Sequence, residues 1–330
     1  IYLRVMLTQL ATPAALSQRE FVWVCRWARR WARKAQLWRS AENGGGLAID
    51  LAGDSAPRWT AAGTPGSALR FIDCVELRRS IRARLRKLDS GSTPDELGLG
   101  KDCPAFAARE LLKTLLRCWN DAPQARRFPR RGTTGRAELI AGFAAIHRII
   151  AGAAFERQIT PWNYTRQQME QIHVFQRVTS PQTALDSGVT IEHWKTQDES
   201  ADGFGLRRDA TGVRLAQRQL VAVRPRGAGQ FILCEVRWLI VNQDESLDMG
   251  AKAMPGLPQA CALRPLPSGH GQADAWTQAF VLPLSGGLAA NLILPVGWYQ
   301  QGRELEFRLQ DEQFRIRLNQ LLDRGYDYQR

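Results

Sequence analysis

The segment 220–239 has the sequence LVAVRPRGAGQFILCEVRWL, and it decides the fold of the second half of the chain. Two apolar runs, at 220–224 and 231–239, flank a group of turn residues at 225–229. Apolar runs separated by a short stretch that contains proline and glycine are typical of a β-hairpin. We therefore predict two antiparallel strands here.

Other segments around this hairpin are also strand-like. Residues 136–141 alternate between two sets of side chains with a period of two, which indicates a half-buried strand. Further strands are expected toward the C-terminus, at 280–283, 292–295, 304–309 and 314–318. Residues 142–151 and 163–171 have helical signals instead. We therefore expect a helical insertion within the β region.

The first third of the chain has the patterns of helices. Residues 18–38 predict one amphipathic helix, because Trp23, Trp27 and Trp31 lie four residues apart on one face. This stripe favours a core helix, and the alternative is a surface helix that binds nucleic acid or a membrane. Further helices are expected at 73–88 and 103–119, and a strand at 47–51.

The positive charge is concentrated in one half of the molecule. The formal net charge is +13, and residues 1–157 hold 27 Lys and Arg against 14 Asp and Glu, whereas residues 158–330 hold 18 of each kind. This asymmetry indicates an anionic partner for the N-terminal half, such as a nucleotide, nucleic acid, an acidic protein or a membrane surface.

Two short motifs are candidates for binding such an anion. The first has the form R-x-x-x-R, with Arg126 and Arg130 at its ends, Arg127 and Phe128 between them and Arg131 next to it. The second has the form D-x-S-x-x-G and consists of Asp198, Ser200 and Gly203. An alternative is that both stretches are ordinary surface turns, since Asp, Ser and Gly also cluster in turns for local reasons.

The residue types of the two motifs suit a guanine nucleotide. An arginine fork can donate two hydrogen bonds to guanine O6 and N7, and it can also bind phosphate oxygens. A carboxylate can accept from the N–H groups of the guanine Watson–Crick edge. A serine hydroxyl can join polar atoms, and a glycine allows a close approach of the backbone.

The ordered pair of motifs resembles the signature of PilZ domains, small β-barrels of bacteria that bind cyclic di-GMP. The resemblance covers about residues 126–265 and implies that Arg126, Arg127, Arg130, Arg131, Asp198, Ser200 and Gly203 bind this dinucleotide. In PilZ domains the motifs lie one hairpin apart, whereas residues 132–197 separate them here. We expect this interval to be an insertion that leaves both motifs at one pocket.

The predicted fold class is therefore α+β. It consists of an α-rich N-terminal domain at 1–125, a PilZ-like antiparallel β-barrel at 126–265 with an insertion at 142–190, and a C-terminal β region at 266–330. Because two β units follow one another, an alternative is that the chain contains two barrels in tandem. Residues 265–275 are the expected linker between the last two regions.

The sequence offers few signals for catalysis. The four histidines, His147, His173, His193 and His270, lack the neighbours of a metal or catalytic motif. The six scattered cysteines predict reduced thiols of a cytoplasmic protein, and no apolar run has the length of a membrane span. We expect a protein that is not an enzyme and that has neither a cofactor nor a metal.

The predicted function is that of a cyclic di-GMP receptor. Binding would change contacts between domains or with a protein partner, and the resemblance implies a process such as pilus function, flagellar motility or biofilm formation. Two alternatives remain at this point. One is a basic nucleic-acid-binding protein, and the other is an adaptor that uses a PilZ-like barrel for protein contacts without a ligand.

Overall fold

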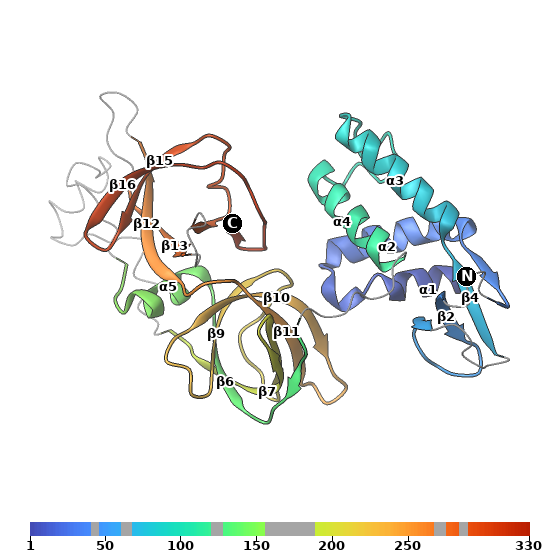
Figure 1. Ribbon diagram of the computed structural model, residues 1–330, viewed down its shortest axis with the longest axis horizontal. Helices are drawn as coiled ribbons and strands as arrows, with labels where there is room; N and C mark the ends of the chain where they lie inside the picture. The colour runs from blue at the N-terminus through green and yellow to red at the C-terminus, as the bar shows by residue number, and fades with distance from the viewer. Residues whose placement is uncertain (41–45, 61–67, 120–127, 156–188, 267–274, 284–289) are drawn as a thin grey trace, which may run out of the picture. The chain divides into compact units, whose positions relative to one another are not determined.

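The structure is a computed structural model, and it describes the chain except for residues 41–45, 61–67, 120–127, 156–188, 267–274 and 284–289 (Figure 1). The described residues form two compact units, Ile1–Arg127 and Phe128–Arg330. The first contains helices and a small sheet, and the second consists mainly of strands. The predicted α+β class is thus confirmed.

Tryptophan side chains form the centre of the first unit. Trp27 stacks on Trp31 with ring centroids 5.6 Å apart, and Trp31 meets Trp119 edge to face at 6.4 Å. All three rings are buried, as expected for a core helix. The helices that carry or surround them are α1 (Tyr2–Leu10), α2 (Gln18–Trp31), α3 (Val75–Asp89) and α4 (Ala105–Cys118).

The helix predicted at 18–38 is shorter than expected. It begins at a capping box, in which Ser17 and Glu20 each accept a hydrogen bond from the other's backbone N–H, and it ends at Trp31. After a 3₁₀ turn, β1 (Gln36–Trp38) pairs with β4 (Leu69–Asp73). The prediction was wrong for residues 36–38 because this pairing depends on a segment more than thirty residues away. Strands β2 (Gly46–Asp50) and β3 (Arg58–Thr60) complete the sheet, in the order β1-β4-β2-β3.

The second unit begins with a closed antiparallel barrel of six strands. Its cyclic order is β7-β6-β9-β10-β11-β8, and β8 pairs back to β7. The strands are β6 (Arg136–Ala141), β7 (Glu192–Ser200), β8 (Gly203–Arg208), β9 (Leu220–Pro225), β10 (Ile232–Val241) and β11 (Leu247–Ala253). The hairpin predicted at 220–239 is confirmed, since β9 and β10 pair directly.

Alternate residues of these strands fill the barrel. The interior contains Leu139, Trp194, Leu206, Val223 and Met249, all of them buried. Residues of opposite parity, such as Ile140, Ala222 and Leu233, belong to a different buried cluster outside the barrel. The period of two in the sequence therefore sorts the strands into an inner and an outer apolar face.

A second sheet follows the barrel, in the order β16-β15-β12-β13-β14-β17. Its strands are β12 (Gln259–Pro265), β13 (Thr277–Leu282), β14 (Asn291–Pro295), β15 (Glu304–Leu309), β16 (Glu312–Arg317) and β17 (Tyr328–Gln329). Because β12 and β13 pair with each other, the predicted linker at 265–275 joins two strands of one sheet. The expected boundary after residue 265 therefore falls inside this sheet.

Helix α5 (Phe143–Ala151) lies between the barrel and the second sheet (Figure 1). Its Ile146 is buried in one cluster with Ile140 of the barrel and Phe280 of the sheet. The helix predicted at 142–151 is confirmed, whereas the one predicted at 163–171 lies outside the described residues. At the C-terminus, the buried Tyr328 hydroxyl donates to Glu235 of β10. These contacts join the two β regions in one unit.

Candidate ligand-binding site

The strand that follows the first motif pairs with the strand that carries the second, in spite of the long interval between the motifs. The short strand β5 (Arg131–Gly132) pairs with the end of β7, so that Arg131 lies opposite Glu199 and Gly132 lies opposite Asp198. Strand β6 continues along the same edge of β7. The barrel is therefore closed in spite of the interval, and Arg130 and Arg131 lie beside the second motif.

An ion pair connects the motifs directly. Arg130 Nη1 donates to Asp198 Oδ1 at 2.5 Å, with side-chain exposures of 24% and 32%. Such partial exposure leaves both groups open to water and to a polar ligand. A ligand that accepts from the guanidinium and donates to the carboxylate could replace each partner of this pair.

A cavity of about 340 Å³ lies at the same end of the barrel. Arg131 and Ser200 line it from the two motifs, and Phe128 and Phe204 supply aromatic surface. Pro129, Glu199 and Ala201 complete the lining. Its volume is at the lower end of the range for small-molecule sites in proteins. Aromatic faces, a guanidinium and a carboxylate are groups that a purine nucleotide can use.

Gly203 has a role that the motif does not reveal. Its φ is +149°, and a Cβ at this position would collide with the carbonyl oxygen of Ala251 on β11. Ser200 Oγ donates to the Gly203 carbonyl at 3.4 Å across the turn between β7 and β8. The missing side chain of Gly203 thus permits closure of the barrel by β8 and β11, independently of any ligand.

Two of the expected site residues cannot be compared with the structure. Arg126 and Arg127 precede the first described residue of the second unit, Phe128, and lie outside the described residues. The sequence interpretation did not select Glu199 or Phe204. The strand alternation after the motif glycine was the available signal for Phe204, and nothing in the sequence marked Glu199.

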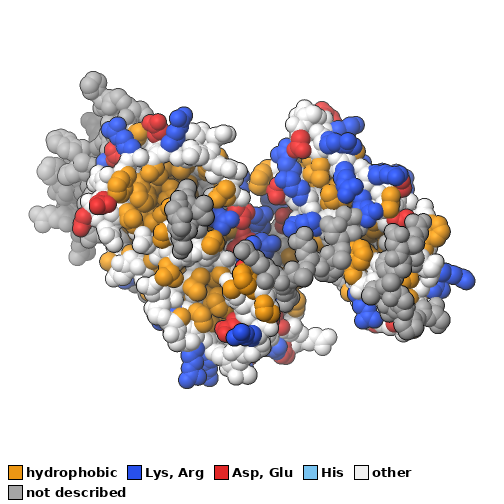
Figure 2. Space-filling model, viewed as in Figure 1, with side chains coloured by type: hydrophobic (Ala, Val, Ile, Leu, Met, Phe, Trp, Pro, Cys, Tyr) orange, Lys and Arg blue, Asp and Glu red, His pale blue; other side chains and the backbone are white. Residues whose placement is uncertain are grey.

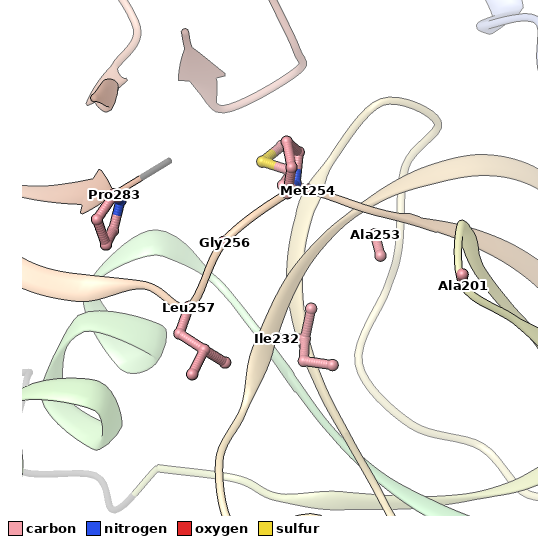
Figure 3. Close-up of a pocket in the computed structure, with 8 residues that line it drawn as sticks. Ala201, Ile232, Ala253, Met254, Gly256, Leu257 and Pro283 are labelled. Carbon is pink, nitrogen blue, oxygen red and sulfur yellow. The ribbon is translucent and has the colours of Figure 1, made fainter. Parts of the chain in front are cut away.

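A second cavity, of about 550 Å³, lies where the chain leaves the barrel. Figure 3 shows Met254 and Leu257 of the connecting segment near Ile232 of the barrel and Pro283, which directly follows β13. Ala201 lines both cavities. This second cavity is mainly apolar, so it differs in chemistry from the first.

The residues that the structure describes contain no group of three His, Cys, Asp or Glu side chains that could hold a metal ion. His147 is buried and donates through Nε2 to the carbonyl of Cys261, while burial lowers the pKa of its imidazole. His193 is exposed, and His173 and His270 lie outside the described residues.

The six cysteines are free thiols. Burial raises the pKa of the Cys103 thiol to about 11 and that of Cys74 to about 12, so neither is an activated nucleophile. Among the described helices, none is both long and apolar enough to cross a membrane.

Comparison with known families gives two matches, one at each end of the chain. Residues 1–40 match the model of the cyclic-di-GMP receptor FimW, N-terminal domain, and residues 261–330 match the FimW C-terminal beta-barrel domain. Comparison with curated proteins gives no match. The resemblance is thus supported at the level of a cyclic-di-GMP receptor family, and neither match is to the PilZ domain itself. Residues 126–203, which carry both motifs, lie outside the two matched segments.

Proposed function

We propose that this chain is a cyclic di-GMP receptor whose ligand binds where the two motifs meet on the barrel. The observation that supports it most directly is the Arg130–Asp198 ion pair beside the cavity lined by Arg131 and Ser200. The two FimW matches support the same ligand class independently, because they lie outside the motif region.

In this proposal the charged groups divide the recognition of the dinucleotide. Arg130 and Arg131 donate to guanine O6 and N7 or to phosphate oxygens, and Asp198 accepts from the guanine N–H groups. Phe128 and Phe204 offer aromatic surface to the base. Arg126 and Arg127 are assigned to the same ligand by the motif alone, and Ser200 and Gly203 shape the turn between β7 and β8.

Ligand binding replaces the Arg130–Asp198 contact by contacts to the dinucleotide. Since Arg130 lies close to the start of the second unit, this exchange is suited to changing the course of the chain between the two units. The change would alter the affinity for a protein partner in pilus, flagellar or biofilm regulation. The protein acts in this view as a cytoplasmic binding protein rather than as an enzyme.

Titration calorimetry with cyclic di-GMP tests the proposal. Arg130→Ala should weaken binding by about tenfold or more, because a bidentate guanine contact contributes about 1–3 kcal/mol. Arg126→Ala should have a similar effect. Arg315→Ala is the matched control, since Arg315 is exposed on β16 in the second sheet, and it should leave the dissociation constant unchanged.

The same titration distinguishes the alternatives. Replacing Asp198 by Asn should weaken dinucleotide binding, although loss of a negative charge favours simple anion binding. Stronger binding after this replacement would contradict the assignment of Asp198 to the base. A nucleic-acid-binding protein would instead show affinity that falls steeply with salt and does not depend on Asp198. A ligand-free adaptor would show no heat of binding at all.

A further inference from the structure

Asp198 lies between two glycines of neighbouring strands. Gly132 on β5 is its register partner on one side, and Gly205 on β8 is its partner on the other. Neither glycine is one of the seven motif residues. The two glycines can therefore be compared as neighbours of the same carboxylate, one on each side.

Only one of these glycines makes room for the carboxylate. A Cβ at position 205 would lie 2.7 Å from Asp198 Oδ1 and 2.9 Å from Asp198 Cγ, well inside the usual contact distance of about 3.5–4.0 Å between carbon atoms. A Cβ at position 132 would meet nothing within 4 Å. The Asp198 carboxylate thus occupies the space that a side chain at 205 would fill.

A β-bulge creates this arrangement. Thr196 pairs with Leu206 and Asp198 pairs with Gly205, so two residues of β7 correspond to one of β8 and Gln197 is the extra residue. Phe204 and Leu206 point into the barrel, and the residue between them faces outward. The bulge consequently places Asp198 over a glycine on the outer face of the barrel.

We propose that Gly205 is a positioning residue for dinucleotide recognition: the space that it leaves free holds the Asp198 carboxylate beside Arg130, at the place where the ligand takes over the contacts of both groups. This inference rests on the proposed function for its effect on cyclic di-GMP. Its structural part does not, because Asp198 Oδ1, the atom nearest to a Cβ at 205, is also the atom that accepts from Arg130 at 2.5 Å.

Gly205→Ala is a selective probe of this role. The backbone of Gly205 is outside the left-handed region, so alanine can adopt it, and the atoms in conflict belong to a side chain that can rotate away. Replacement of Gly203 would be a poor probe. Its Cβ would collide with backbone atoms of Ala251, so barrel closure itself would be disturbed.

Two variants of the full chain, Gly205→Ala and Gly132→Ala, are to be compared in crystal structures and by titration calorimetry with cyclic di-GMP. We expect the Arg130–Asp198 contact to be retained in Gly132→Ala and lost in Gly205→Ala. The dissociation constant should rise about tenfold or more in Gly205→Ala, as for loss of one base contact, and stay within about twofold in Gly132→Ala. Adding Gly205→Ala to Asp198→Ala should cause no further loss, because the carboxylate is already absent.

Each outcome bears on the proposal. Equal effects of the two glycine replacements, or an additive effect in the Asp198→Ala background, would show that Gly205 does not act through Asp198. An intact Arg130–Asp198 contact in the Gly205→Ala crystal would also overturn it. If the wild-type protein does not bind cyclic di-GMP, the proposed function fails, and the two crystal structures still decide whether Gly205 positions Asp198.

Discussion

The two units carry almost the same number of basic residues but pair them in different ways. Residues 1–127 contain 22 Lys and Arg with 12 Asp and Glu, and residues 128–330 contain 23 with 20. In the first unit, Arg30 donates to the carbonyl of Gly98 and Arg84 donates to that of Leu97. Figure 2 shows the Lys and Arg side chains that gather on the visible face of this helical unit. The first unit thus keeps a surplus of positive charge at its surface.

In the β unit, arginines instead pair with carboxylates on adjacent strands. Arg208 pairs with Glu192 at 2.9 Å, and Arg264 pairs with Glu306 at 2.5 Å. An Arg–carboxylate pair is therefore common in this unit, and the Arg130–Asp198 pair alone is weak evidence for a ligand site. The adjoining cavity and the glycine beneath Asp198 distinguish it from the structural pairs.

The largest effect that tests this comparison should come from Arg208→Ala. Its partner Glu192 has only 10% of its side chain exposed, so the replacement would leave a nearly buried carboxylate without its cation. We expect a loss of about 3–5 kcal/mol in the free energy of unfolding, as for other broken buried pairs. Chemical denaturation, with hydrogen exchange to locate the effect in the β unit, measures it.

Arg84→Ala is the matched replacement in the helical unit. The guanidinium of Arg84 lies 5.1 Å from the Trp31 ring centroid, and that of Arg208 lies 5.0 Å from the Trp194 centroid, so both variants lose a similar cation–π contact. Replacing Arg84 leaves only carbonyl and hydroxyl oxygens without their donor. We therefore expect a loss of about 1–2 kcal/mol in the free energy of unfolding. Equal losses in the two variants would contradict the proposed difference between the units.

The sequence predicted local elements better than the contacts between them. The hairpin at 220–239 and the strands predicted at 304–309 and 314–318, observed as β15 and β16, follow from alternation and turn residues, which act over short distances. Residues 36–38 form a strand through pairing with a distant segment, and the linker expected at 265–275 connects two paired strands of one sheet rather than two regions. Both errors arise because strand pairing is decided by partners far away in the chain.

At the candidate site, too, the sequence predicted residues but not the strand pairing around them. The motif pair predicted that Arg130 and Asp198 would lie within reach of one ligand, and the structure places the two side chains in contact. The bulge at Gln197 and the register of Gly205 could not be predicted, since both depend on how β7 aligns with β8. The motifs thus marked the two charged groups, and only the register shows that Gly205 lies next to one of them.

A smaller effect is expected at His147, which has no charged partner in the part of the chain that the structure describes. Burial lowers the pKa of the imidazole below its usual value of about 6.5, so the folded β unit favours the neutral form. The stability from this residue is present above pH 6.5 or so and is lost as the pH falls, because the unfolded chain binds the proton more readily. Unfolding followed between pH 8 and 5 should show this slope, to be flattened by His147→Gln and retained in the control His193→Gln.

The smallest effect should come from Asp102 in the helical unit. Unlike His147, this exposed carboxylate has a charged partner, Arg26. Hydrogen bonds from Arg26 and then from Trp23 lower the pKa of Asp102 to about 2. Since the folded pKa is below the unfolded value of about 3.9, the stability is present above that value and is lost as the pH falls toward 2. Arg26→Gln should reduce this acid sensitivity, and added salt should do the same in the wild type, because both groups are well exposed.

Hydrogen exchange in α2 between pH 5 and 2 would measure this acid sensitivity. An acid sensitivity that persists unchanged in Arg26→Gln and at high salt would show that Arg26 does not set the pKa of Asp102, and that exposed pairs contribute no pH dependence to the helical unit.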